Sequence, residues 1–262
     1  MAPAMGEFIR QHRPMIGIVG GVGPYAGVDL ARKVFDETAA ASDQEHLPLA
    51  MLSVPEIISD RTEFLLGEAA DNPGVAIAEV IGRLERIGAT VVGIPCNTAH
   101  APAIFDVIAA RLAEANSKVA LVHMIEEVGR YLGEHFPHLR RVGVLSTTGT
   151  WRAGVYAQGL APLGIEVIVP DEPLQTRAVH PAIYDPGFGI KARAHPVTAR
   201  ARSLLDEAVA FCRGLGAEAI ILGCTELPLA IPEPRIGGMP VIDPTRILAR
   251  ALIREIAPAR LR

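Results

Sequence analysis

Two cysteines stand at positions in the chain where a thiol could act as an acid or a base. Cys96 follows a short apolar run at residues 91–94, and Cys224 follows a similar run at residues 219–222. Each run is typical of a buried strand in a parallel sheet, and each cysteine is followed by residues that open a turn or a helix. Free backbone N–H groups and the positive end of a helix lower the pKa of a thiol at such a position and can bind an anion. We interpret the two thiols as a candidate pair of acid–base groups.

The spacing of glycines and cysteines indicates that the chain contains two copies of one α/β unit. The offset from Gly88 to Gly216 is 128 residues, the same as between the two cysteines, and the offset from Gly17 to Gly143 is 126. A matched spacing of this kind is the signature of a duplication. Two doubly wound units that face each other would place their strand ends, and therefore both cysteines, on opposite walls of one cleft.

A racemase needs such an arrangement, because one base removes a proton from one face of a carbon and a second group delivers a proton to the other face. The two groups exchange roles in the reverse direction, and two nearly equivalent thiols meet this requirement. The free-energy cost of lowering the thiol pKa is also compatible with this role. Lowering a thiol pKa from about 8.5 to about 7 costs about 2 kcal/mol, and a favourable helix terminus returns up to about 2 kcal/mol.

The composition is that of a folded globular protein and excludes several classes of partner. The chain has 262 residues, half of them apolar, which is enough for one large domain or two of ordinary size. The net charge of −4 comes from interspersed residues without a basic stripe, so we expect no nucleic-acid partner. The 3 cysteines lack zinc-ligand spacing and an even disulfide framework, which favours a cytoplasmic location. Residues 1–13 lack a signal-peptide pattern and no apolar stretch is long enough to span a membrane, so we expect no membrane partner.

Hydrophobic periodicity and glycine punctuation predict the elements that position the cysteines. A strand at 15–19 leads into a glycine-rich turn at 20–24, and a hydroxyl-rich turn at 146–150 mirrors it in the second half. The glycine turn suits an anion at a helix N-terminus, but its spacing does not match the Walker lysine loop, and no acidic residue closes the next strand. We therefore do not expect a nucleotide. The remaining predictions are strands at 49–54 and 142–145 and helices at 26–41, 72–87 and 198–215.

Three further residues have both a structural and a functional interpretation. Arg61 follows the second predicted strand, where a guanidinium could bind a substrate carboxylate, although it could also be an arginine in a solvated loop. Cys212 lies within a predicted helix and is interpreted as a small core hydrophobe. His100 is interpreted as packing against or capping the helix after Cys96, with tuning of that thiol as the alternative.

The residues around the two cysteines resemble those of the cofactor-independent aspartate/glutamate racemases, and specifically the aspartate-racemase branch. The matching motifs are Pro-Cys-Asn-Thr-Ala-His at 95–100 and Gly-Cys-Thr-Glu-Leu at 223–227, and the resemblance covers nearly the whole chain from Met15. It implies that Cys96 and Cys224 are the two catalytic bases. It also implies a set of residues that bind the substrate. These are Asn97, Thr98 and Thr225 at the α-carboxylate, Arg61 and Lys191 at the side-chain carboxylate, and Thr147 in the hydroxyl-rich turn.

The same comparison of motifs indicates which acidic amino acid is favoured. The glycine turn is similar to that of the aspartate-racemase branch, although Val22 stands where methionine is common. Proteins close to glutamate racemase carry an Asp-Ser pair where this chain has Gly20 and Gly21, and a histidine where it has Glu226. Glutamate is therefore the less favoured substrate.

The resemblance implies an α/β fold of two pseudo-symmetric doubly wound domains with mostly parallel sheets and the active site in the cleft between them. The first domain would comprise residues 1–117 plus 239–262 and carry Cys96. The second would comprise residues 118–238 and carry Cys224. In this division, Val241, Ile242 and the last helix pack back on the first domain.

The predicted function is interconversion of L- and D-aspartate, or of a closely related acidic amino acid, without pyridoxal phosphate, another cofactor or a metal. Two alternatives remain. One is an enzyme of the same fold that decarboxylates a malonate or isomerises maleate, and the other is a non-enzymatic binding protein with two lobes. The pair of cysteines, each near a threonine, favours the racemase, because a binding protein has no need for a thiol at both strand ends. The resemblance also implies a homodimer.

Overall fold

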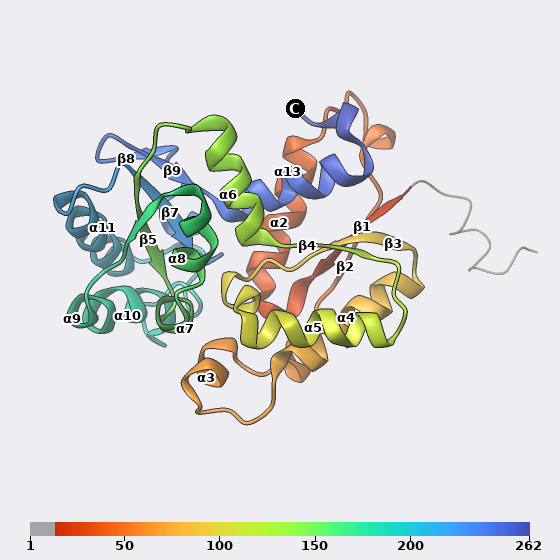
Figure 1. Cartoon of the computed structure of the whole chain (residues 1–262), viewed down its shortest axis with the longest axis horizontal. Helices are drawn as coiled ribbons and strands as arrows, with labels where there is room; N and C mark the ends of the chain where they lie inside the picture. Colours follow the sequence, from red (N-terminus) through yellow and green to blue (C-terminus); the bar gives the residue numbers. More distant parts are fainter. Residues whose placement is uncertain (1–13) are drawn as a thin grey trace, which may run out of the picture.

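The protein is built from two sheets of mostly parallel strands that are connected by helices (Figure 1). The computed structural model describes residues 14–262, so the expectation about residues 1–13 lies outside the described part. All paired strands run parallel except β8 and β9 in the described part of the chain, which confirms the predicted fold class. In spatial order, the first sheet contains β2 (Leu49–Leu52), β1 (Met15–Val19), β3 (Ala89–Gly93) and β4 (Ala120–Val122), and the second contains β6 (Glu166–Ile168), β5 (Arg141–Ser146), β7 (Ala219–Gly223), β9 (Met239–Ile242) and β8 (Arg235–Ile236).

The helices begin and end close to the predicted positions. The helices expected at 26–41, 72–87 and 198–215 correspond to α2, α4 and α11. The first of them starts earlier than expected because Pro24 fits the first turn of a helix. The α-helices are α2 (Pro24–Glu37), α3 (Arg61–Leu66), α4 (Pro73–Arg86), α5 (Pro102–Glu114), α6 (Met124–His135), α7 (Thr148–Ala153), α8 (Val155–Leu160), α9 (Glu172–Leu174), α10 (His180–Tyr184), α11 (Ala199–Gly214), α12 (Leu227–Ala230) and α13 (Pro244–Ile256). Shorter 3-10 segments include η1 (Gly20–Val22), η3 (Pro55–Ile57) and η4 (Asn97–His100), and η6 (Gln175–Val179) is a π-helix.

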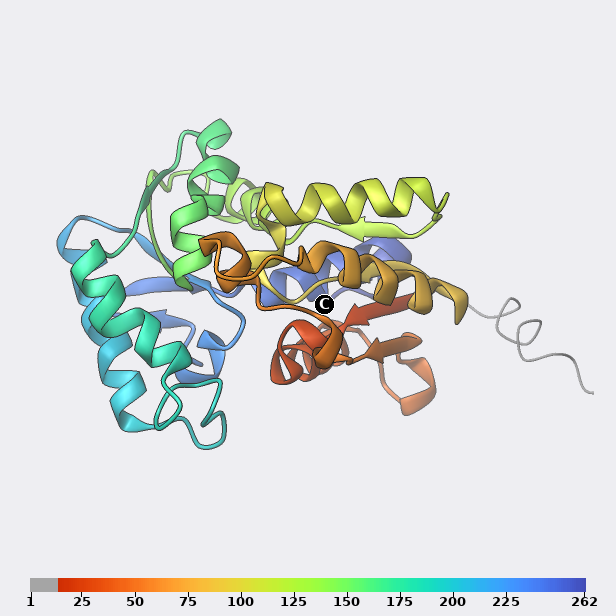
Figure 2. The same cartoon turned by 90° about the horizontal axis from the view of Figure 1, so that it is seen from below.

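The first sheet separates two layers of helices. Val91 packs in the same core cluster as Leu30 of α2 and Leu248 of α13, whereas Val92, on the next position of the strand, packs with Ile81 of α4 and Ile108 of α5. Successive side chains of a strand point to opposite faces, so β3 is buried on both sides. Figure 2 shows α13, in blue, among the red-to-yellow elements of this sheet, although the chain has by then passed through the second sheet.

The duplication predicted from the glycine spacing is present in three dimensions. A side-chain carbon built on Gly17 in β1 would lie 2.8 Å from Val92, and one built on Gly143 in β5 would lie 2.6 Å from Ile220. The other neighbours correspond in the same way, at an offset of 128 residues. They are Leu84 and Ala89 around Gly17, and Cys212 and Ala217 around Gly143. Cys212 therefore occupies the position of a core leucine, which agrees with its interpretation as a hydrophobe.

The sheets divide the chain at slightly different residues from those expected. β4 lies in the first sheet, although residues from 118 onward were assigned to the second domain. Val241 and Ile242 were expected on the first domain, and this is wrong, because they pair with Ile220 and Ile221 of β7. The last helix, α13, does return to the first sheet, where it packs on α2 and β3, and the residues after it bridge to Thr38. We retain the division into two domains as a proposal, with crossings between the sheets near His123 and Asp243.

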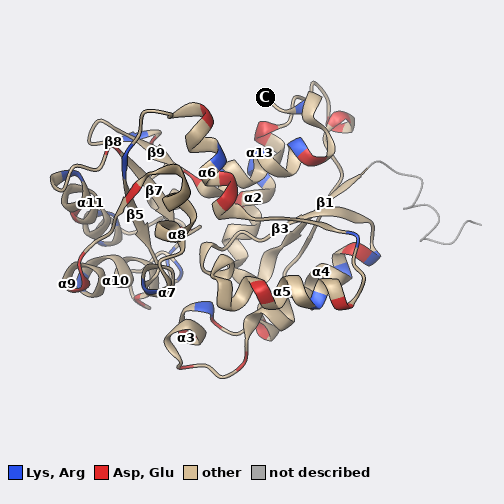
Figure 3. Ribbon diagram, viewed as in Figure 1, with Lys and Arg blue, Asp and Glu red and all other residues tan. Residues whose placement is uncertain are grey.

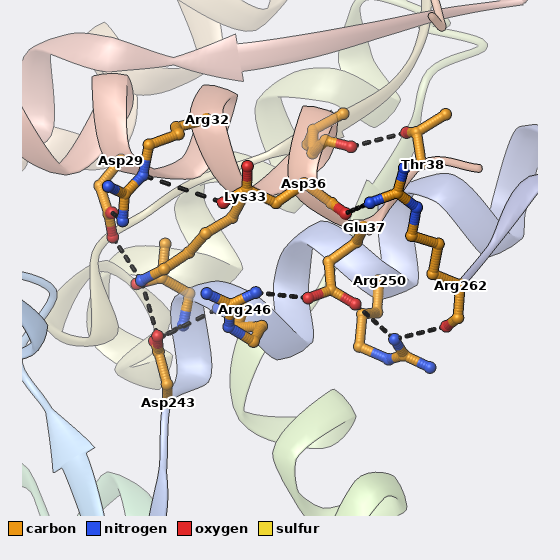
Figure 4. A network of polar contacts seen from close by, with 12 residues as sticks. Asp29, Arg32, Lys33, Asp36, Glu37, Thr38, Asp243, Arg246, Arg250 and Arg262 are labelled. Carbon is orange, nitrogen blue, oxygen red and sulfur yellow. Dashed lines mark hydrogen bonds and ion pairs between the residues drawn. The ribbon is translucent and has the colours of Figure 1, made fainter. Parts of the chain in front are cut away.

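A buried ion-pair network joins α2 to the segment that returns from the second sheet (Figure 4). Lys33 is only 2% exposed, and its ammonium contacts Asp29 and also Asp243, the latter at 2.6 Å. Asp243 in turn caps α13, since its carboxylate accepts hydrogen bonds from the backbone N–H groups of Thr245 and Arg246. One lysine thus connects a helix of the first unit to the start of α13.

Charged residues of both signs are interspersed over the described part of the chain (Figure 3). This distribution agrees with the expectation from the sequence. Within residues 14–262, none of the helices has the length and apolar character needed to cross a membrane.

Candidate active site

One small pocket between the two sheets is lined by every residue that the sequence analysis placed in the site. Its volume is about 10 Å³, which leaves room for about one water molecule. This closed form is too small for an amino acid, so the side chains that line the pocket, or its two sides, have to move before a substrate binds. The predicted residues that line the pocket are Arg61, Cys96, Asn97, Thr98, Thr147, Lys191, Cys224 and Thr225, and the sequence analysis did not assign Val22, Thr62, Tyr184 and Glu226 to it.

Cys96 lies where β3 ends, at the N-cap of η4, and is 7% exposed. Burial, together with the neighbouring His123, lowers the pKa of His100 to about 3, so this histidine is neutral. Its Nδ1 lies 2.9 Å from the carbonyl oxygen of Cys96, and since a carbonyl can only accept, Nδ1–H is the donor. His100 also stacks on Phe105. His100 therefore packs against α5, as interpreted, but it does not cap that helix, because no side chain of the described residues makes a cap hydrogen bond at its N-terminus. Its hydrogen bond holds the backbone of Cys96 instead.

Arg61 begins α3 and is 8% exposed, so it is not an arginine in a solvated loop. Its guanidinium donates to the carbonyl oxygens of Ser59, at 3.2 Å, and Val22, while Nε has no partner among the described residues. Burial alone would lower the pKa of Arg61, but Cys96 and then Asp60 raise it, and the result lies above its ordinary value. Arg61 is therefore a permanent positive charge that would attract a thiolate at Cys96.

Cys224 has the opposite electrostatic environment. Its Sγ donates a hydrogen bond to Oε2 of Glu226 at 3.0 Å. Burial and then this carboxylate raise the pKa of Cys224 well above its ordinary value, and the ammonium of Lys191 offsets only part of the effect. The lowering of the thiol pKa that the sequence predicted at a strand end is therefore wrong for Cys224. Here burial and a carboxylate outweigh the backbone dipoles, and the thiol stays protonated.

Glu226 is the main residue of the site to which the sequence analysis gave no chemical role. It is 5% exposed, and Lys191 Nζ donates to its Oε1 at 2.9 Å. Burial would raise the pKa of Glu226, but Lys191 and the hydrogen bond from Cys224 lower it below its ordinary value, so the carboxylate is charged. Its position two residues after a candidate catalytic thiol was the available signal. The sequence could not indicate its pairing with a lysine 35 residues upstream.

Hydrogen bonds between side chains of the two units close the pocket. Thr98 Oγ1 lies 3.0 Å from Thr147 Oγ1 and 2.8 Å from Thr150 Oγ1. On another side, Tyr184 OH donates to Thr62 Oγ1 at 3.1 Å. Hydroxyl groups can be donors or acceptors, so the same groups that pair with each other in this form could bind a carboxylate in an open one.

The chain is similar to known amino-acid racemases over most of its length. A family model described as Asp/Glu/Hydantoin racemase matches residues 19–252. The broad specificity amino-acid racemase RacX of Bacillus subtilis is 28% identical over 248 residues, which is 91% of this chain and 96% of that protein. The solved structure of Picrophilus torridus aspartate racemase matches with a TM-score of 0.76 and 30% identity, covering 93% of this chain and 94% of that one. A glutamate racemase of Pseudomonas paraeruginosa is 31% identical over 208 residues, 73% of this chain and 72% of that protein.

Proposed function

The chain belongs to the Asp/Glu/hydantoin racemase family and is an isomerase of the racemase class, and on this premise we propose that it interconverts L- and D-aspartate or a closely related acidic amino acid. The observation that carries the proposal is that Cys96 and Cys224, from equivalent strand ends of the two units, line one pocket. Aspartate is favoured over glutamate by the motifs around Gly20 and Glu226 and by the similarity to the Picrophilus torridus enzyme. Membership of this family favours racemisation over decarboxylation and over binding without catalysis.

We base the proposed starting states of the two thiols on the charged groups that surround them. Arg61 attracts a thiolate at Cys96, whereas Glu226 accepts the proton of Cys224 in a hydrogen bond. In one direction, the Cys96 thiolate takes the α-proton from one face of the substrate and the Cys224 thiol gives its proton to the other face. Turnover leaves Cys96 protonated and Cys224 as a thiolate, which is the form that the opposite enantiomer requires. Proton exchange with water restores the first form.

Removal of an α-proton places negative charge on the substrate's α-carboxylate, and donors aimed at that group would lower the barrier. The candidates are Asn97 and the hydroxyls of Thr98, Thr147 and Thr225, all of which are at most 5% exposed. Hydrogen bonds to a developing charge in a site that excludes water are worth more than the same bonds in water. We assign the α-carboxylate to these four residues.

The side-chain carboxylate of the substrate is assigned to Arg61 and Lys191. Arg61 Nε has no partner among the described residues, and both side chains line the pocket. Lys191 already forms an ion pair with Glu226, so its charge serves both the substrate and the second thiol. Because of this double role, we expect removal of the Lys191 ammonium to lower turnover of all substrates, and that of acidic substrates most.

Incubation of the purified protein with L-aspartate, L-glutamate and L-alanine, followed by chiral chromatography, tests the proposal. We expect aspartate to approach equal amounts of both enantiomers without added cofactor. Arg61→Ala and Lys191→Ala should lower the ratio of aspartate to alanine turnover about 10- to 100-fold, because each removes a charged hydrogen bond to the distal carboxylate.

The matched control is Arg83→Ala, which removes an exposed arginine of α4 whose one ion pair within residues 14–262 is with Glu79. It should leave both rates unchanged. Absence of aspartate racemisation would overturn the proposed substrate. If the ratio of aspartate to alanine turnover stayed unchanged in both variants, Arg61 and Lys191 would not bind the side-chain carboxylate. A homodimer, a cytoplasmic location and independence from cofactors remain predictions.

A further inference from the structure

Tyr156, on α8 of the second unit, contacts the amide of Asn97 in η4 of the first unit. Its hydroxyl donates to Oδ1 at 2.6 Å. This distance is normal for an O–H···O bond and shorter than the usual range for N–H···O, so the oxygen of the amide, and not its nitrogen, faces the tyrosine. Tyr156 does not line the pocket, and no pattern in the sequence indicated a role for it in the site.

The other end of the same amide has no partner. Asn97 is 2% exposed, and its Nδ2 makes no hydrogen bond to any described residue. Leaving a buried amide donor unpaired costs free energy, so such a group usually has an acceptor in the functional state. Asn97 lines the pocket between the two thiols, where the acceptor would be a substrate carboxylate.

We propose that Tyr156 is a positioning residue of the racemase, which fixes the amide of Asn97 so that its NH₂ group faces the substrate's α-carboxylate. This inference rests on the proposed function. Without the hydroxyl, the amide could turn by half a rotation and present Oδ1 to the carboxylate, which would repel it. Tyr156 is 2% exposed and burial, with Asp243 and Cys224 nearby, raises its pKa well above the ordinary value, so the hydroxyl keeps its proton.

The hydrogen bond between Tyr156 and Asn97 joins the two units, so the orientation of the amide depends on how the units are placed. Since Tyr156 and Asn97 belong to different units, the amide is oriented only while the units are in contact around the pocket. Recognition of the α-carboxylate would therefore be completed on closing and not on first contact with the open form.

The test is Tyr156→Phe, which removes one oxygen and keeps the ring in the core. We expect kcat/KM for L-aspartate to fall about 10-fold, since the variant weakens a hydrogen bond to a charged group without deleting the donor. A purely structural role would not change the preference for a carboxylate. We therefore also measure, by calorimetry, the binding of L-aspartate and of its α-carboxamide. The wild type should prefer the carboxylate, and Tyr156→Phe should lose much of this preference, because a free amide can turn its oxygen towards a carboxamide.

Two further variants make the result unambiguous. Tyr131→Phe deletes the same oxygen on α6, away from the pocket, and should leave both affinities unchanged. In Asn97→Ala, the additional change Tyr156→Phe should have less than about a twofold effect, because the tyrosine then has nothing to position. Normal carboxylate preference in Tyr156→Phe, or additive losses in the double variant, would overturn the inference. Binding is measured apart from turnover, so a wild type that binds aspartate without racemising it would refute the proposed function instead.

Discussion

The thiol of Cys224 donates a hydrogen bond to Oε2 of Glu226, two residues further along the chain, across 3.0 Å. The two candidate catalytic thiols are therefore equivalent in position but differ in their charged neighbours, because Cys96 has the guanidinium of Arg61 beside it. The proposed mechanism uses this difference, with Cys96 as the first base and Cys224 as the first acid. Each direction of a racemase needs one thiolate as the base and one thiol as the acid, with the roles of the two cysteines exchanged.

The first prediction concerns the pH dependence of turnover. Loss of the Cys224 proton leaves the pair without an acid, so this thiol governs the alkaline limb of a bell-shaped profile of kcat/KM. Glu226→Gln removes the carboxylate that raises the pKa of Cys224, and the alkaline limb should move to lower pH. The shift should be the same from L- and from D-aspartate. Glu233→Gln, which changes an exposed carboxylate paired with Arg202, is the control. An alkaline limb that stays or moves to higher pH would contradict the role of Glu226.

The second prediction separates the three thiols by reactivity. Cys212 is fully buried, and burial raises its pKa to about 12, so little reactive thiolate forms at neutral pH. Iodoacetamide should inactivate the enzyme by modifying Cys96, and substrate should protect. Mass spectrometry should find Cys212 unmodified and Cys224 modified more slowly than Cys96, because burial and Glu226 raise the pKa of Cys224 as well. Cys212→Ala should keep turnover and lose about 1 kcal/mol of stability, as for a small deletion in a packed core. Inactivation that follows modification of Cys212 would exclude this assignment.

The third prediction tests whether the thiols lie on opposite faces of the α-carbon. Cys96→Ala and Cys224→Ala should each abolish racemisation, because one face then has no acid or base. The remaining thiol can still remove the α-proton from its own face and return a deuteron from D₂O. Each variant should therefore exchange one enantiomer without inverting it, and the two variants should exchange opposite enantiomers, which NMR can follow. Exchange of the same enantiomer by both would rule out the two-sided mechanism.

The fourth prediction concerns stability. Lys33→Met should lower the free energy of unfolding by about 3 kcal/mol, because it leaves Asp29 and Asp243 partly buried without their shared cation. Arg32 still contacts Asp29, at 3.4 Å, which limits the loss. Arg83→Ala breaks an exposed pair and should cost less than about 1 kcal/mol. Urea unfolding measures both, and equal effects would show that the buried network adds nothing.

The sequence predicted those features that depend on local pattern. The apolar runs before Cys96 and Cys224 became β3 and β7, and Gly88 and Gly216, both with positive φ, precede them. The prediction that Val241 lies on the first domain was wrong. A short apolar strand fits either sheet, and only its pairing with β7 places it in the second sheet.

The contacts that set the charge and orientation of the site residues could not be predicted from the sequence. They join side chains that are distant along the chain, as between Lys191 and Glu226, or that come from different units, as between Tyr156 and Asn97. Neither residue type nor spacing indicates which of many polar side chains will meet. Only the resemblance to the racemase family made Lys191 a candidate for the substrate, and its ion pair with Glu226 became visible only in the fold.

The chain passes between the two sheets twice, near His123 and near Asp243, and this restricts how the closed pocket can open. Two bodies joined at two points can rotate about the line through those points, while sliding and twisting apart are resisted. Opening would then follow a single arc, and closing would retrace it. Such a pivot would return Cys96 and Cys224 to the same separation after each substrate enters, without any further contact to guide them.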